Sequence, residues 1–167
     1  MFTSISQFTD LWKQEMHATH TVFAALTDAS LSQSGDVEGR SLARLAWHLA
    51  QTMPEMLHKA GLHVEGPAET EPPPSSAATI VSEYDKAAKS TLEQVEKNWT
   101  DATLKEEDEM YGQKWARGTT LTVLVLHQVH HRGQMTVLMR QAGLRLPSFY
   151  GPVREDWAQW GMQPPAI

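Results

Sequence analysis

Residues 119–143 have the sequence TTLTVLVLHQVHHRGQMTVLMRQAG, and this stretch decides the fold. Its apolar residues return every three or four positions, which keeps their side chains on one face of an α-helix. The residues of this apolar stripe are Leu121, Leu124, Val125, Val129, Leu138 and Ala142. We expect a helix over about residues 120–142, capped by Thr119 or Thr120, ended by Gly143 and more deeply buried than any other.

Three other stretches, at about residues 6–26, 41–60 and 77–98, show the same spacing of apolar side chains. No segment alternates apolar and polar residues convincingly, as a half-buried strand does. The sequence therefore predicts an all-α protein, a four-helix bundle formed by a single domain over residues 1–167. The order in which the helices pack stays open, because the last two connections are long enough to cross an end of the bundle.

Three segments add detail to this bundle. Pro54 lies inside the second predicted helix, so we expect a kink there or a helix in two pieces. The acidic run Glu106–Glu109 is interpreted as a solvated loop, because consecutive carboxylates point in different directions. After Gly143 we expect a C-terminal tail that packs on the bundle and carries a short helix at residues 154–160.

The composition excludes several classes of function. Hydrophobic residues make up 41% and charged residues 20%, an ordinary globular balance, and the net charge of −6 argues against binding to nucleic acid. Cysteine is absent from the sequence, so neither a disulfide nor a thiolate metal site can form. The first residues lack the basic start and apolar run of a signal peptide, and no stretch is apolar enough to span a membrane. We therefore expect a cytoplasmic protein without a nucleic-acid or membrane partner.

The histidines of the fourth predicted helix indicate a metal site. His127 and His131 are one helical turn apart, so they lie on the same face. Both rings can direct a nitrogen at one point about 2 Å away, the usual metal–imidazole distance. His48 is the best candidate for a third ligand, because it lies in an apolar helix where an unpaired imidazole is costly to bury. Three imidazole ligands leave a position open for water or substrate, which is typical of a reactive metal.

Four residues near this site are candidates for contacts with the ligands or with a substrate: His130, Arg132, Gln134 and Tyr150. For Arg132 and Gln134, a role in the bundle surface or in a dimer contact stays open. The remaining histidines are interpreted as ordinary exposed or hydrogen-bonded side chains: His17, His20, His58 and His63. The spacing of His127 and His131 also leaves open a bundle whose histidines bind no metal.

Three motifs resemble those of the DinB (YfiT-like) family: HQVHHRGQ at residues 127–134, LMRQAG at 138–143 and FYGP at 149–152. The stretch SLARLAWHL at residues 41–49 resembles the second-helix motif of the same family. The resemblance implies a four-helix bundle, often a homodimer, in which one histidine of the second helix and two of the fourth hold a divalent metal. These roles fall on His48, His127 and His131, and the resemblance suggests zinc or nickel.

The resemblance also implies a class of reaction. The wider superfamily includes transferases and isomerases that use low-molecular-weight thiols such as bacillithiol or mycothiol. We therefore expect a metal-dependent enzyme, either a thiol S-transferase or a hydrolase, in which the metal activates a thiol or a water molecule. A non-catalytic metal-binding or stress-response protein is the alternative.

Overall fold

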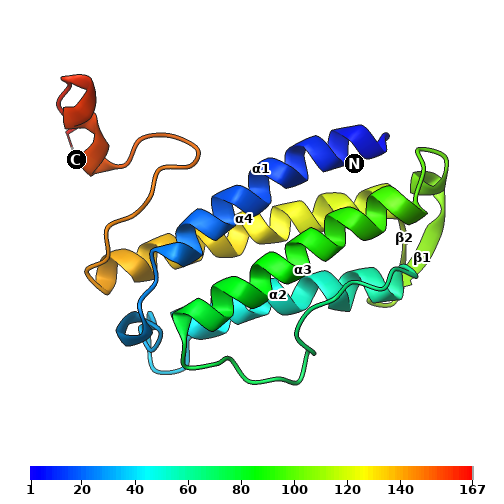
Figure 1. The fold of residues 1–167 in the computed structure, drawn as a ribbon, viewed down its shortest axis with the longest axis horizontal. Helices are drawn as coiled ribbons and strands as arrows, with labels where there is room; N and C mark the ends of the chain where they lie inside the picture. Colours follow the sequence, from blue (N-terminus) through cyan, green and yellow to red (C-terminus); the bar gives the residue numbers. More distant parts are fainter. Residues whose placement is uncertain (167) are drawn as a thin grey trace.

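The computed structural model describes residues 1–166, and four long helices dominate them (Figure 1). The helices are α1 (Ile5–Ala24), α2 (Leu42–Lys59), α3 (Ala77–Asn98) and α4 (Arg117–Gln141). The predicted all-α four-helix bundle is thus confirmed. None of the helices in residues 1–166 is long and apolar enough to cross a membrane.

Serine caps begin three of the four helices. The side chains of Ser4, Ser41 and Ser76 each accept a hydrogen bond from the backbone N–H three residues later. At the other end, α2 and α4 are each followed by a glycine in the left-handed region, Gly61 and Gly143. Between its cap and its glycine, α2 runs past Pro54 as one helix, so the second of the two alternatives expected there, a helix in two pieces, is wrong.

The bundle does not place the helices in chain order. Both α1 and α2 pack against α3 and α4, so that α1 lies diagonally opposite α2, and α3 diagonally opposite α4. The connections 25–41 and 99–116 therefore cross the ends of the bundle, whereas α2 and α3 are sequential neighbours. This arrangement sets α2 beside α4, which brings together the two helices that carry the predicted ligands.

The acidic run Glu106–Glu109 is solvated as expected at Glu106, Glu107 and Glu109, but the expectation that it forms a loop is wrong. Strand β1 (Glu107–Met110) pairs antiparallel with β2 (Gln113–Ala116). The two turn residues between them, Tyr111 and Gly112, both have positive φ, as the commonest hairpin turns require. Met110 is fully buried, and the hairpin lies against one end of α2 and α4 (Figure 1).

Helix α4 begins at Arg117, earlier than the threonine caps predicted at Thr119 or Thr120. The Arg117 guanidinium binds the carboxylates of Asp108 in β1 and Glu106 just before it, which fixes the first turn of the helix to the hairpin. Gly118 lets the N-terminus approach closely, since a Cβ at this position would lie 2.3 Å from the backbone oxygen of Phe2. The start of α4 is therefore set by contacts with distant segments.

The C-terminal tail has two parts. Leu144, Leu146 and Phe149 are partly buried against the core, in agreement with the predicted packing. The predicted short helix is present as a 3₁₀-helix at Arg154–Trp160, but none of its seven residues is buried. Figure 1 shows this last part standing away from the bundle.

Candidate metal centre

The adjacent helices α2 and α4 bring three imidazoles to one point. His127 and His131 lie one turn apart on α4, and His48 faces them from α2. The Nε2 atom of His127 lies 3.2 Å from that of His48 and 3.1 Å from that of His131. Among residues 1–166, this is the one group of three metal-ligating side chains whose ligand atoms all lie within 4.8 Å of one another.

These separations suit ligands that share one metal ion. With metal–nitrogen bonds of about 2.1 Å, neighbouring ligand nitrogens are about 3.0 Å apart in octahedral and about 3.4 Å apart in tetrahedral geometry. The two Nε2–Nε2 distances fall between these values, and the ligand atoms of all three histidines lie within 4.8 Å of one another. The three residues could therefore hold one divalent transition metal.

Hydrogen bonds alone do not satisfy the three rings. The Nδ1 of His131 lies 2.7 Å from the Oε1 of Gln134 and donates to it, so the Nε2 of His131 carries a lone pair. The Nε2 of His127 can give its single proton to only one of its two neighbours. One nitrogen is then left facing another without a proton between them. A shared cation would satisfy all three lone pairs.

The surroundings keep the cluster neutral. Burial is the main cause that lowers the pKa of His48 to about 3 and that of His127 to about 4, and the other histidines and Arg40 add to the effect. Burial also lowers the pKa of His131, although its hydrogen bond to Gln134 opposes the change. At neutral pH all three imidazoles therefore have free lone pairs, which metal ligation requires.

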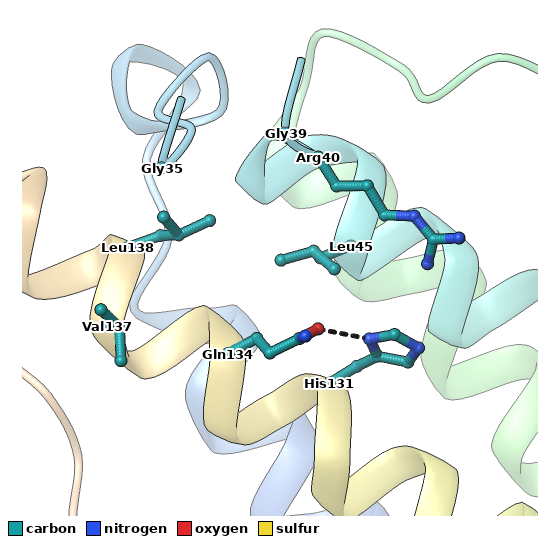
Figure 2. A pocket seen from close by; sticks show the side chains of 8 residues that line it. All are labelled: Gly35, Gly39, Arg40, Leu45, His131, Gln134, Val137 and Leu138. Atoms are coloured by element: carbon teal, nitrogen blue, oxygen red, sulfur yellow. Dashed lines mark hydrogen bonds between the residues drawn. The ribbon is translucent and has the colours of Figure 1, made fainter. Parts of the chain in front are cut away.

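Two features orient the ligand rings. Gln134, one turn along α4, holds His131 in the tautomer that presents Nε2 (Figure 2). The buried Nδ1 of His127 has no hydrogen-bond partner among the described residues. Nothing there fixes the proton of His127, which can therefore present Nε2 as a lone pair.

A cavity of about 570 Å³ opens beside His131 (Figure 2). Its walls are mainly apolar, and its lining residues are Gly35, Gly39, Arg40, Leu45, His131, Gln134, Val137 and Leu138. The volume lies within the usual range for small-molecule sites. A ligand in this cavity would touch one edge of the imidazole cluster.

The other predicted contact residues separate into two groups. Gln134 touches the cluster directly, and the ring of His130 is exposed and lies 4.9 Å from that of His131 between centroids. Arg132 and Tyr150 instead meet Glu15 of α1, on another side of α4. The structure therefore brings Gln134 to the three ligands, and places Arg132 and Tyr150 in a separate polar cluster.

This second cluster connects α1, α4 and the tail. Arg132 donates to the Glu15 carboxylate and to Tyr150 at 2.5 Å each, and to the Thr19 hydroxyl at 2.8 Å. Although Tyr150 is 62% exposed, its hydroxyl reaches inward to Glu15. Desolvation of this inward-reaching hydroxyl and its bond to Glu15 raise the pKa of Tyr150 to about 12, so the hydroxyl keeps its proton.

The remaining histidines lie outside the cluster, as expected. His17 is exposed, His20 binds Asp85 at 2.9 Å, and His58 lies 2.9 Å from the carbonyl oxygen of Val64. Sequence analysis did not predict one residue that lies at the site. Arg40 lines the cavity just before the cap of α2, and no local pattern marks a single arginine in a polar loop.

The chain matches a protein-family model and is similar in sequence to a known protein. The model of the DinB family matches residues 1–162. A Bacillus subtilis (strain 168) protein described as "Uncharacterized protein YrdA" is 40% identical over 167 residues, which cover all of both chains.

Two solved structures share the fold. A DinB-like protein from Bacillus cereus ATCC 10987 has a TM-score of 0.86 and 39% identity, covering 90% of this chain and 100% of that one. A DinB-like protein from Bacillus subtilis, YjoA, has a TM-score of 0.67 over 86% of this chain and 97% of that one. At 19% identity, the second likeness concerns the fold alone.

Proposed function

The chain belongs to the DinB family, and from this premise we propose that it is a metal-dependent enzyme that holds one divalent transition metal through His48, His127 and His131. The observation that carries the proposal is the convergence of three neutral imidazoles at the edge of a cavity large enough for a small substrate. Zinc and nickel are the metals we propose, since both accept imidazole ligands.

The proposed reaction is transfer of a low-molecular-weight thiol to an electrophile, or hydrolysis. A divalent ion supplies Lewis-acid chemistry when bound, which makes a bound thiol or water nucleophilic at neutral pH. The protein contributes the positions of the groups. Gln134 fixes the His131 ring, and Leu45, Val137 and Leu138 offer an apolar wall to the substrate body. The three histidines fill only part of a coordination sphere, which leaves room for a substrate atom.

Metal content tests the ligand assignment. We expect about one zinc or nickel ion per chain in purified protein, and almost none in His127→Gln. The matched controls remove an imidazole outside the cluster, at exposed His17 on α1 and at exposed His130 on α4. Both should keep the metal. Equal metal in wild type and His127→Gln would defeat the assignment.

A substrate screen separates the enzyme from a non-catalytic metal protein. Metal-loaded protein is incubated with a panel of thiols and electrophiles, and product formation and melting temperature are followed. We expect thiol consumption that His127→Gln abolishes. Absence of turnover together with absence of a thiol-dependent shift in melting temperature would favour a role in metal binding or stress response.

We further propose that the protein forms a homodimer. Helix α4 carries apolar side chains on its outer face as well as in the core, and Leu126 is 60% exposed there. A helix that is apolar on both faces usually has a partner on each. Sedimentation equilibrium should give twice the chain mass for wild type and the chain mass for Leu126→Glu. A monomeric wild type would reject the dimer and leave the metal site untouched.

A further inference from the structure

The cavity beside the imidazole cluster has one formally charged side chain in its lining. Seven of its eight lining residues are glycine, aliphatic, the Gln134 amide or the neutral His131 ring, and the eighth is Arg40. The same arginine also lines a smaller cavity of about 210 Å³ on the His48 side of the cluster. Arg40 thus lies at the junction of the two openings that flank the cluster.

Arg40 is one of two arginines whose guanidinium binds no side chain within residues 1–166. Five of the seven arginines bind a side chain of this protein: Arg44, Arg117, Arg132, Arg140 and Arg145. Within residues 1–166, the guanidinium of Arg40 makes no hydrogen bond or ion pair. Arg154 shares this state, but it lies on the exposed 3₁₀-helix of the tail and lines neither cavity.

The position of Arg40 also matches the site. Figure 2 shows its side chain extending from the end of the loop before α2 toward the side on which the His131 ring lies.

We propose that Arg40 selects the substrate: the cavity binds a small amphipathic anion, with its apolar body against Leu45, Val137 and Leu138 and its carboxylate on the Arg40 guanidinium. The proposal rests on the proposed function in one respect, because it takes this cavity as the substrate site of the metal centre. It adds the chemical class of the substrate, which the metal ligands alone do not specify.

The energetics favour an anion over a neutral analogue. A carboxylate that enters an apolar cavity loses hydration, and only an opposite charge or several donors offset that cost. A guanidinium offers two parallel N–H donors that match a carboxylate. Because the chain as a whole carries a net charge of −6, a positive lining is also a local exception that an anion can recognise.

The test uses two probes of the same shape, 4-phenylbutanoate and its neutral amide. Binding to full-length, metal-free protein is measured by calorimetry, so that coordination of the carboxylate to a metal cannot replace Arg40. We expect the carboxylate to bind wild type about tenfold more tightly than the amide, a ratio typical of one partly exposed charge-assisted hydrogen bond. Arg40→Gln should weaken the carboxylate about tenfold and leave the amide unchanged.

Arg154→Gln is the matched control, since it removes the other free arginine outside the cavity. It should keep the wild-type preference, and higher salt should weaken the carboxylate alone. Equal binding of the two probes to wild type, an unchanged preference in Arg40→Gln, or no binding of either probe at millimolar concentration would each overturn the proposal.

The outcome is separable from that of the metal assignment. Zinc and nickel content is measured on the same variants as purified, before the metal is removed for calorimetry. Arg40→Gln should then keep about one ion per chain, with an unchanged circular dichroism spectrum. If the protein purifies without metal but prefers the carboxylate through Arg40, the proposed function is refuted and the anion site is retained. If it purifies with metal but shows no such preference, the anion site is refuted and the metal assignment is retained.

Discussion

His131 and Arg132 are neighbours in the chain, yet they belong to polar clusters of different kinds on two sides of α4. His131 is 8% exposed and meets two other imidazoles beside a cavity. Arg132 is 0% exposed and meets Glu15, Thr19 and Tyr150 inside the contact between α1, α4 and the tail. Both clusters are costly to bury, but only around Arg132 does the protein itself pair opposite charges, although the buried Nε of Arg132 has no hydrogen-bond partner among the described residues.

The difference distinguishes a structural cluster from a binding cluster. Around Arg132, a positive charge faces a carboxylate, and both terminal nitrogens of the guanidinium donate to oxygen acceptors. Around His127, three imidazole Nε2 atoms converge, and there are too few protons for a hydrogen bond in both of the close N–N contacts. A buried polar group left unsatisfied costs stability unless a ligand or ion completes it. The predictions below test this distinction, from the largest expected effect to the smallest.

Breaking the completed cluster should have the largest effect. Arg132→Ala leaves the Glu15 carboxylate buried without its partner, so we expect the free energy of unfolding to fall by about 3–5 kcal/mol. Urea unfolding measures the loss. The double variant Arg132→Met/Glu15→Leu removes both charges and should recover most of it, and this serves as the measurement if the single variant fails to fold. A loss below about 1 kcal/mol in the single variant would contradict a structural role.

Completing the open cluster should stabilise the protein. Zinc at about one hundred times its dissociation constant should raise the free energy of unfolding of wild type by about 2.7 kcal/mol. His127→Gln should show almost none of this gain, whereas His17→Gln should show all of it. Thermal melts with and without zinc give the comparison. A similar gain in His127→Gln would place the ion elsewhere.

Low pH should destabilise the metal-free protein through the imidazole cluster. The folded pKa values of about 3 for His48 and about 4 for His127 lie below the unfolded value near 6.5. Below pH 6.5 the unfolded chain therefore binds more protons, and stability present above that pH is lost as the pH falls toward about 4. Allowing for partial exposure, we expect His127→Gln to lose about 1 kcal/mol less than wild type between pH 7 and pH 4. Urea midpoints of the metal-free proteins at each pH measure this, and parallel curves would contradict it.

A substitution on a third face of α4 should change the free energy of unfolding least. Gly133 follows Arg132 directly, is exposed, and has nothing within 4 Å of the place of a Cβ. Because glycine is a poor residue inside a helix, Gly133→Ala should raise the free energy of unfolding of the monomeric Leu126→Glu protein by about 0.5–1 kcal/mol. Urea unfolding measures the change. A lower free energy of unfolding in this monomer would contradict the prediction.

Local patterns were sufficient to predict most of the helical fold. Helix α3 begins and ends at the predicted residues, because the cap Ser76 and the extended Trp99 bound a regular apolar stripe. The meeting of His127 with His131 follows from helical geometry alone, and His48 was found because an imidazole is unusual in so apolar a helix.

Long-range contacts account for what the sequence did not predict. Strands of four residues with the sequences EDEM and QKWA carry no clear alternation, and the hairpin is held by its turn and by Arg117. Glu15 and Arg132 pair across 117 residues, and neither position suggests the other. Arg40 became a candidate only when the fold placed it over the cavity.

The pairing of the first helix with the last has a consequence for biosynthesis. Glu15 and the apolar face of α1, with Phe8 and Trp12, emerge from the ribosome long before α4 has been made. Until residue 132 has been added, the carboxylate that is later buried lacks its guanidinium, and the side chains beside it lack the cover that α4 provides. The contact between α1 and α4 can therefore form only after residue 132 has been translated, so the buried core is completed late in synthesis.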